Sequence, residues 1–290
     1  MRLFILLALL LSMAEAKLTI AVSYPYIASL TEAVGGEHVR VESLAQGNWD
    51  PHFVVPRPSL ITKVRNADLL IINGADLEIG WLPPLLSRAS NAQLAQKTNV
   101  LELSRSVRLI EIPRDTSRAG GDVHPDGNPH FHLDPGNIPV LAGSIADFLA
   151  RKDPANASEY RKNLAEFQQQ WNGHLKRWEK QMAPMRGKEV VQYHGVFNYF
   201  LRAYGMRSAA TIEPLAGIPP SSAHTMELIA LIGEHSPCCI MHDVYHATKT
   251  AEFLKAKTGI RIVVLPHDVG AMRGAESLVS LFDTLVQSLR

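Results

Sequence analysis

The feature that most constrains the fold is an alternation of short β-type runs with helical patterns, which occurs on both sides of a long helical stretch. Residues 18–22 form a β-rich run, and the helical pattern that follows Pro25 ends at Gly35. Strands that alternate with helices form parallel sheets covered by those helices, so the sequence predicts an α/β fold. The predicted strands are 18–22, 39–44, 68–72, 189–192, 209–212, 238–241 and 261–265, and the predicted helices are 25–35, 58–66, 81–89, 196–204, 222–235, 248–258 and 275–289.

Between the two alternating halves, residues 137–182 carry no β signal. The segment from Asp153 to Asn156 divides this stretch, and Asn156 is a candidate N-cap for the second piece. The apolar spacing of that piece predicts a helix of about 27 residues, roughly 40 Å long. We therefore expect an N-terminal α/β lobe at 17–136, a helical linker at 137–186 and a C-terminal α/β lobe at 187–290. Ligands of such sheets bind beyond the carboxyl ends of the strands, in a cleft between the lobes.

The first sixteen residues have the pattern of a secretory signal. Arg2 is followed by an apolar run over residues 3–13 and by a small-residue exit, Ala14-Glu15-Ala16. The run is too short for a permanent membrane span. Because no cysteine stands at the expected cleavage point before Lys17, we expect an exported, periplasmic protein without a lipid anchor.

Charge and cysteine content argue against several classes of protein. The chain has 290 residues, of which 46% are hydrophobic, and a formal net charge of +1. It can bury a large core, but it lacks the electrostatic footprint of a protein that binds nucleic acid or an anionic membrane. Its two cysteines, Cys238 and Cys239, are adjacent in a predicted strand, where a disulfide would be strained. We expect two buried free thiols that form no metal site by themselves.

Histidines near the ends of predicted strands are candidate metal ligands. His52, His194 and His267 each follow a predicted strand, which places them at the cleft. Three more histidines lie in the loop 114–135, where we expect two of them to be exposed to solvent. Neutral imidazole is a good ligand for Zn²⁺, and a closed tetrahedral site needs four donors. The loop histidines are His124, His130 and His132, and the six histidines expected at the surface are His38, His174, His224, His235, His242 and His246.

Three motifs resemble those of the metal-specific solute-binding proteins of bacterial ATP-binding-cassette (ABC) importers, the zinc and manganese cluster. Residues 48–52 (NWDPH), followed by Pro58-Ser59 and residues 67–69, are similar to the family's first-ligand loop. Residues 128–135 (NPHFHLDP) resemble its second-ligand motif, and residues 193–194 (YH) before Phe197 resemble its third. The resemblance covers essentially the whole chain after residue 16.

The resemblance implies that His52, His130 and His194 are metal ligands and that a fourth donor lies in the loop after the last strand. His267 stands at the family's position for that donor and Asp268 follows it, so both are candidates, and position favours His267. A set of imidazoles favours Zn²⁺ over Mn²⁺, whose sites in the family usually carry two carboxylates. The carboxylates expected to orient the imidazoles, from their proximity in sequence, are Asp50, Asp134 and Glu213.

The resemblance also implies a receptor that captures the ion between two lobes and delivers it to the membrane permease of an ABC importer. A long rigid helix between the lobes implies modest closure, and we expect a monomer that is not an enzyme. A manganese- or iron-specific protein of the same fold is one alternative, and a surface adhesin or metal chaperone is another. A secreted zinc hydrolase is a less favoured alternative, because nothing beyond the metal itself supports catalysis and the sequence contains neither an HExxH helix nor a GxSxG elbow. The roles of His124 and His132 stay open.

Overall fold

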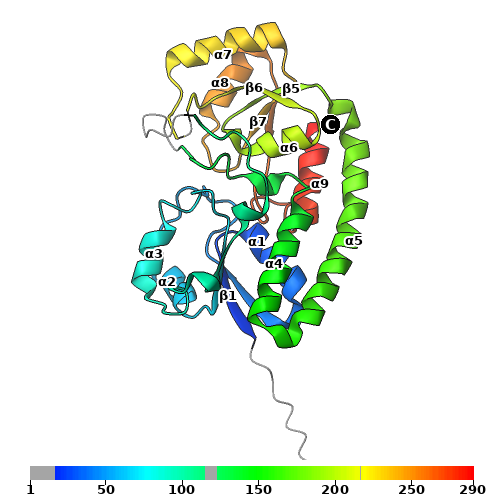
Figure 1. Ribbon diagram of the computed structural model, residues 1–290. Helices are drawn as coiled ribbons and strands as arrows, with labels where there is room; N and C mark the ends of the chain where they lie inside the picture. The colour runs from blue at the N-terminus through cyan, green and yellow to red at the C-terminus, as the bar shows by residue number, and fades with distance from the viewer. Residues whose placement is uncertain (1–16, 115–122, 216) are drawn as a thin grey trace, which may run out of the picture.

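The computed structural model describes residues 17–114, 123–215 and 217–290. These residues form two α/β lobes, one above the other in Figure 1, with a long helix alongside both. Each lobe contains a four-stranded sheet in which all strands are parallel. The expected two-lobed α/β fold is confirmed. The signal predicted at residues 1–16 lies outside the described residues.

The N-terminal sheet has the strand order β2-β1-β3-β4. Its central strands are apolar on both faces and buried, as expected for a parallel sheet covered by helices. β1 pairs with β2 in a register that sets Leu18 opposite Val39, and it pairs with β3 with Ile20 opposite Leu69. The short β4 was missed in the sequence, because three residues show no measurable alternation. The strands are β1 (Leu18–Val22), β2 (Val39–Ser43), β3 (Leu69–Ile72) and β4 (Val100–Glu102).

The C-terminal sheet repeats this topology, with the strand order β6-β5-β7-β8. In both lobes the first strand pairs with the second and the third, and the fourth strand lies at the edge beside the third. The two halves therefore share a topology although they show no sequence repeat. The strands are β5 (Glu189–Gln192), β6 (Arg207–Thr211), β7 (Ile240–His242) and β8 (Ile262–Val264).

The helices begin and end close to the sequence prediction. Proline stands in the first turn of α1 and α2, where its missing N–H costs no hydrogen bond. The side chain of Ser221 caps α7 by accepting a hydrogen bond from the backbone N–H of His224. The helices are α1 (Pro25–Gly35), α2 (Pro58–Arg65), α3 (Leu82–Ala89), α4 (Ile138–Lys152), α5 (Ala157–Met182), α6 (Asn198–Ala203), α7 (Ser222–His235), α8 (Lys249–Thr258) and α9 (Leu278–Leu289).

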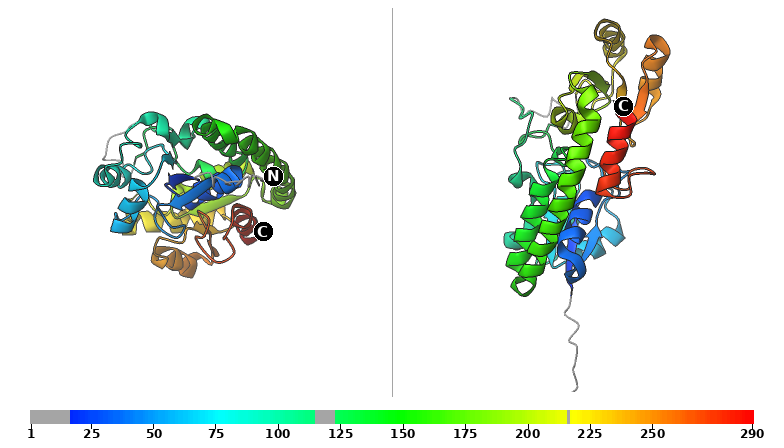
Figure 2. Two further views of the ribbon diagram at one scale, coloured as in Figure 1. Left: turned by 90° about the horizontal axis from the view of Figure 1, so that it is seen from below. Right: turned by 90° about the vertical axis from the view of Figure 1, so that its right-hand side faces the viewer.

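The long helix α5 has 26 residues and runs beside both lobes (Figure 2, right). Its Trp171 and Trp178 pack against Phe282 of α9, with ring centroids 5.6 and 5.2 Å apart. At its other end Asn163 donates a hydrogen bond to the carbonyl oxygen of Val34 in α1, at 2.9 Å. Because one continuous apolar core also contains residues of both lobes, α5 is a fixed bridge between them.

Asn156 occupies the predicted N-cap position of α5, immediately before Ala157. Its side chain makes no capping hydrogen bond, however, and instead donates to Asp153 at 2.8 Å. The reason is a single 3₁₀ turn, Pro154–Asn156, which joins α4 directly to α5 and leaves Asn156 outside the extended backbone conformation of an N-cap.

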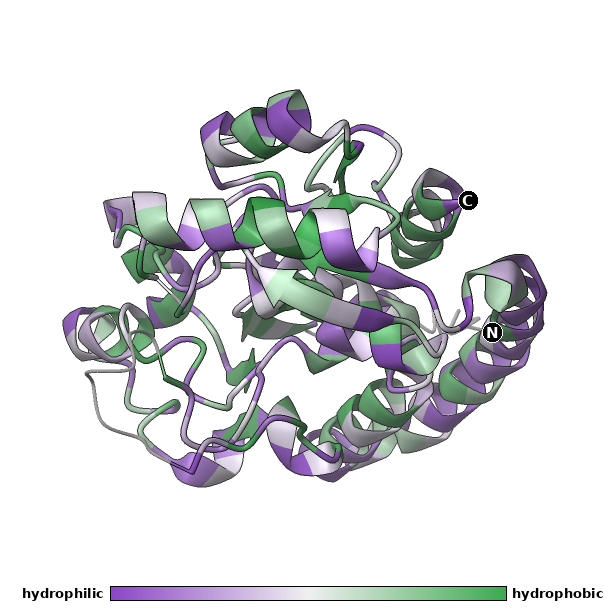
Figure 3. Cartoon of the chain, turned by 90° about the horizontal axis from the view of Figure 1, so that it is seen from above, coloured by the Kyte–Doolittle hydropathy of each residue, from purple (hydrophilic) through white to green (hydrophobic). Residues whose placement is uncertain are grey.

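Hydropathy follows this arrangement. In Figure 3 the hydrophilic residues lie mostly on the outer faces of the helices, and the strands between them are largely hydrophobic. Within the described residues, no helix combines the length and the apolar character that a membrane span requires.

Both cysteines are free thiols, as expected, and their Sγ atoms are 3.7 Å apart. The expectation that both are buried inside a strand is wrong in part. They precede β7, and Cys239 is buried whereas Cys238 is half-buried.

Candidate metal centre

Three histidines from separate segments meet between the lobes. His52 lies between β2 and α2, His130 lies between β4 and α4, and His194 follows β5. One ligand-capable atom of each lies within 4.8 Å of the other two. The ring centroids are 5.5 Å (His52 to His130), 5.6 Å (His52 to His194) and 5.7 Å (His130 to His194) apart. Nitrogen ligands of a tetrahedral zinc ion are about 3.3 Å apart, so a small contraction would bring the three onto one ion.

Asp50 holds His52 in one tautomer. Its Oδ1 lies 2.9 Å from His52 Nδ1 and also accepts the backbone N–H of His52 at 2.9 Å. Burial raises the pKa of Asp50, but the hydrogen bonds and charge of His52 outweigh it and leave the pKa below its usual value. The ionised carboxylate can only accept, so Nδ1 carries the proton and Nε2 presents its lone pair. Among the described residues this buried Nε2 has no hydrogen-bond partner.

Glu213 holds His194 in the same way. Its Oε2 lies 3.0 Å from His194 Nδ1, and the Glu213 side chain is only 5% exposed. The other carboxylate oxygen lies 3.5 Å from Nε2 of His246, whose Nδ1 is 2.8 Å from Asp243. Burial lowers the pKa of His246, but Asp243 and Glu213 outweigh it and raise that pKa overall. The two carboxylates therefore favour the protonated form of His246, which would be a positive partner for the carboxylate beside His194.

His130 is the most deeply buried member of the cluster. Neither of its ring nitrogens has a hydrogen-bond partner among the described residues. Burial and the neighbouring His52 and His194 hold the pKa of His130 well below its usual value, so the ring is neutral. A buried imidazole with two unpaired nitrogens loses its hydration without compensation, which costs about 1–3 kcal/mol for each group. A bound ion would remove that cost for one of the two nitrogens.

The backbone around His130 is fixed from both lobes. Asn128 accepts the backbone N–H of His130 at 2.9 Å and donates to the carbonyl oxygen of Gly195 in the C-terminal lobe at 2.9 Å. From the N-terminal lobe, Asn73 donates to the carbonyl oxygen of Pro129 at 3.1 Å. These bonds set the position of His130 relative to His194.

The expectation that two of the three loop histidines are exposed to solvent is wrong. His130 and His132 are buried and His124 is half-buried. The segment folds inward between the lobes, which its polar composition did not indicate. His132 stacks on Tyr26 with ring centroids 4.3 Å apart, and its Nε2 lies 2.8 Å from the carbonyl oxygen of His267.

His267 lies outside the three-histidine group found among the described residues. Its Nε2 is 3.1 Å from the carbonyl oxygen of Trp49, its ring packs edge-on against Tyr245 at 4.8 Å, and burial lowers its pKa to about 4. Asp268 is also buried. Its Oδ1 accepts the backbone N–H of Val269, and burial raises its pKa to about 8, so the group is protonated at neutral pH.

Two further expectations about the surroundings are corrected. Asp134 orients no histidine among the described residues, because its carboxylate accepts the backbone N–H of Gly136 at 2.8 Å. Of the six histidines expected at the surface, His242 is fully buried on β7 and His235 is exposed. His38, His174, His224 and His246 are half-buried. The contact between His246 and Glu213 was not predicted from the sequence, because the two residues lie 33 positions apart and share no motif.

The fold and the cluster together define a two-lobed α/β protein with a candidate metal site between its lobes. A family model described as ZnuA, "Zinc-uptake complex component A periplasmic", matches residues 20–290. The chain therefore belongs to the ZnuA family, and the resemblance inferred from the three motifs is confirmed.

Individual relatives are similar over different lengths. The "High-affinity zinc uptake system protein ZnuA" of Paracoccus denitrificans (strain Pd 1222) is 26% identical over 300 residues, which cover 91% of this chain and 88% of the relative. The "Manganese ABC transporter substrate-binding lipoprotein PsaA" of Streptococcus anginosus is 29% identical over 195 residues, 67% of this chain. The match spans only 61% of that streptococcal relative. A solved structure, "Crystal structure of ZnuA", shares the fold with a TM-score of 0.78 at 23% identity and covers 94% of this chain and 100% of that one.

Proposed function

We propose that the protein is an extracytoplasmic receptor that binds a Zn²⁺ ion through His52, His130 and His194 and delivers it to the membrane permease of an ABC importer. The observation that carries the proposal is the convergence of three imidazoles, of which His52 and His130 have buried nitrogens with no hydrogen-bond partner in the part of the chain that the structure describes. A carboxylate on the outer nitrogen of two of them fixes the tautomer that a metal ligand needs. The cluster serves binding rather than catalysis.

The chemistry of the donors favours Zn²⁺. Imidazole nitrogen suits zinc, whereas Mn²⁺ prefers oxygen ligands. The carboxylates of Asp50 and Glu213 contact the outer nitrogens of His52 and His194, so they support the ligands and do not replace them. Manganese is the alternative cargo, since relatives of similar identity are named for manganese and for zinc. The sequence position predicts His267 as a fourth donor.

Family membership supports a place outside the cytoplasm, because the matching family is described as periplasmic. Attachment to the membrane is a separate question. The streptococcal relative is named a lipoprotein, which is at odds with the expectation of an unanchored protein. Fractionation of cells that express the full chain distinguishes an unanchored carrier from a membrane-anchored one. Recovery in the soluble periplasmic fraction supports an unanchored carrier, and recovery with the membranes overturns it. Light scattering of the purified protein tests the predicted monomer.

Binding is tested by competition of Zn²⁺ and Mn²⁺ against a chromophoric chelator at neutral pH, with metal content measured by mass spectrometry. We expect one tightly bound zinc ion, and we expect His52→Ala and His194→Ala to lose it. His235→Ala is the matched control, because His235 is exposed at the end of α7 and pairs only with Glu189 among the described residues. Absence of binding by the wild type, or unchanged affinity in His194→Ala, would overturn the proposal.

Delivery is tested by uptake of radioactive zinc into cells that lack the gene. Wild-type protein should restore uptake at low external zinc, and His194→Ala should fail although it is exported in equal amount. If His194→Ala restored zinc uptake, delivery of zinc would not depend on this site.

A further inference from the structure

A fourth imidazole, that of His124, stands beside the three-histidine cluster. Its ring centroid lies 5.3 Å from that of His52, closer than any pair within the cluster. The ring also lines the same pocket as His130 and His194. Because His124 belongs to the segment before the NPHFHLDP motif, no ligand position of that motif includes it.

The hydrogen bonding of His124 leaves one nitrogen free in the form that binds metals. Its Nδ1 lies 3.1 Å from the carbonyl oxygen of Ala75. A carbonyl oxygen can only accept, so Nδ1 carries the proton and Nε2 presents a lone pair. This Nε2 is buried and has no hydrogen-bond partner within the described part of the chain. His52 shows the same pattern, with the carboxylate of Asp50 in place of the carbonyl, and Nδ1 of His194 likewise contacts the carboxylate of Glu213.

The carbonyl group that holds His124 is presented by an unusual turn. Gly74, Ala75 and Asp76 all have positive φ, at 82°, 51° and 57°. For residues with a Cβ atom this conformation costs about 1–2 kcal/mol each, and it persists only where the surrounding structure holds it. Ala75 is fully buried, so the turn is fixed against the interior and aims its carbonyl oxygen at the imidazole.

The other histidines near the cluster are poorer candidates for an additional metal ligand. Both nitrogens of His246 face carboxylates, Asp243 and Glu213. Nδ1 of His132 and of His267 has no hydrogen-bond partner among the residues described, but the ring of His132 stacks on Tyr26 and that of His267 packs against Tyr245. The ring of His124 is in contact with a ring of the cluster itself.

We propose that Nε2 of His124 is the fourth donor to the bound metal ion, in place of His267. This inference rests on the proposed function, because it assumes that His52, His130 and His194 hold the ion. His124 lies outside the group whose atoms are all within 4.8 Å of one another, so it must approach the ion when the three others contract around it. Four neutral nitrogen donors make a closed tetrahedral site that suits Zn²⁺.

The test uses Co²⁺ as a spectroscopic substitute for Zn²⁺ in the chain from Lys17, with the wild type and the variants His124→Ala, His267→Ala and His194→Ala. We expect the wild type to give the intense visible bands of four-coordinate Co²⁺. His124→Ala should weaken zinc affinity by at least about 10-fold, as expected for a lost ligand, and should change the Co²⁺ spectrum. Added imidazole should restore the wild-type spectrum by filling the open position. His235→Ala is the matched control.

The outcomes separate this inference from the proposed function. Wild-type affinity and an unchanged Co²⁺ spectrum in His124→Ala would overturn the role of His124. The role of His124 would also be overturned if His267→Ala lost zinc affinity and added imidazole restored it. Absence of metal binding by the wild type would refute the proposed function itself. X-ray absorption of the zinc-loaded wild type should show four imidazole ligands, and three imidazoles would contradict the proposal without reference to any variant. Because His267 would give the same count of four, the comparison of His124→Ala with His267→Ala assigns the fourth imidazole.

Discussion

Glu213 offers the sharpest test of the proposed metal site, because it would act on a bound ion only through His194. Its carboxylate is buried, lies 3.0 Å from Nδ1 of His194, and lies 3.5 Å from Nε2 of His246. Substitution by Gln keeps the shape and an amide oxygen that can still accept from Nδ1, but it removes the negative charge. Substitution by Ala removes the hydrogen bond as well.

The size of the effect follows from what each variant removes. Loss of a partner behind a metal-binding histidine costs about 10–100-fold in affinity, which corresponds to about 1.4–2.8 kcal/mol. We expect Glu213→Ala to lose zinc affinity by about 100-fold, the upper end of this range, because the imidazole loses both its orientation and its electrostatic support. Glu213→Gln should lose about 10-fold in zinc affinity or less, because only the charge is removed.

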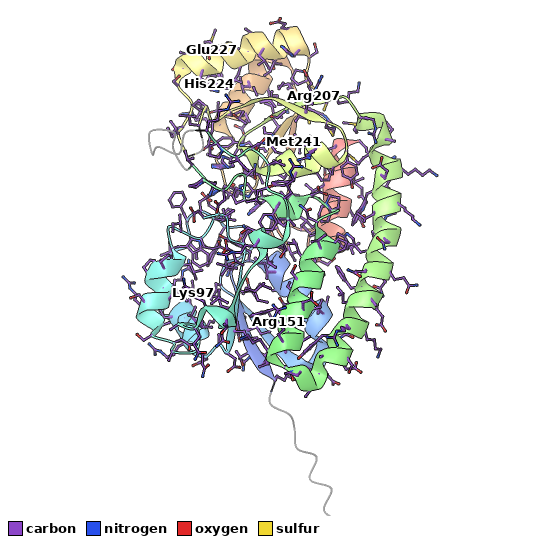
Figure 4. All side chains as sticks on the ribbon, viewed as in Figure 1. Lys97, Arg151, Arg207, His224, Glu227 and Met241 are labelled. Atoms are coloured by element: carbon purple, nitrogen blue, oxygen red, sulfur yellow. The ribbon has the colours of Figure 1, made fainter. Side chains whose placement is uncertain are left out.

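The assay is zinc competition against a chelator at neutral pH, with unfolding of the metal-free protein followed in parallel. Glu227→Gln is a matched control, because Glu227 also pairs with a histidine, His224 Nδ1 at 3.5 Å, but lies on α7 at the outer end of the C-terminal lobe (Figure 4). Its zinc affinity should equal that of the wild type. If both Glu213 variants bound zinc as tightly as the wild type while His194→Ala did not, the argument that Glu213 orients His194 would fail.

Three further predictions concern stability. Zinc at 1,000 times its dissociation constant should stabilise the fold by about 4.1 kcal/mol, and a chelator should reverse this; an unchanged melting temperature would contradict specific binding. Phe282→Ala should destabilise the protein by about 3–5 kcal/mol, because its ring is buried against Trp171 and Trp178, whereas Phe253→Ala on the surface of α8 should cost far less in the same denaturant titration. The free energy of unfolding of the metal-free protein should fall by at most about 2.7 kcal/mol per pH unit as the pH drops from 6.5 towards 4.5, because unfolding then takes up about two net protons. A free energy of unfolding that stayed constant over this pH range would refute the prediction. Burial lowers the pKa of four histidines, to about 4 for His124, His132 and His267 and well below the usual value for His130, so these four take up protons on unfolding. Burial raises the pKa of Glu78 to about 7 and that of Asp268 to about 8, so these two acids release protons on unfolding.

Much of the fold was predictable because it depends on local patterns. The long helix α5 and its limits followed from apolar spacing, and seven of the eight strands were identified, in the order that a parallel α/β fold requires. The errors occurred where local pattern carries little information. β4 is three residues long, and Asn156 stands at the predicted N-cap position of α5 but, at the end of a 3₁₀ turn, its side chain makes no capping hydrogen bond.

The site was predictable only in part. Three motifs identified His52, His130 and His194, which the structure brings together. Sequence position pointed to His267, whereas the ring in contact with the cluster is that of His124. Composition alone suggested that two of the three histidines in the segment 114–135 were exposed, because a segment rich in Gly, Pro and Asp is usually a solvated loop.

The sequence by itself determined the periodicity of strands and helices, the separation into two halves and the residue types available as ligands. These follow from side-chain chemistry and near-neighbour spacing. The tertiary structure decided which imidazoles meet, which of their nitrogens is free, and that Glu213 and His246 support His194. Such contacts join residues tens of positions apart, and their tautomers depend on partners such as the carbonyl oxygen of Ala75, which any residue type at that position would supply. Side-chain identity does not encode them, and only the folded backbone sets them.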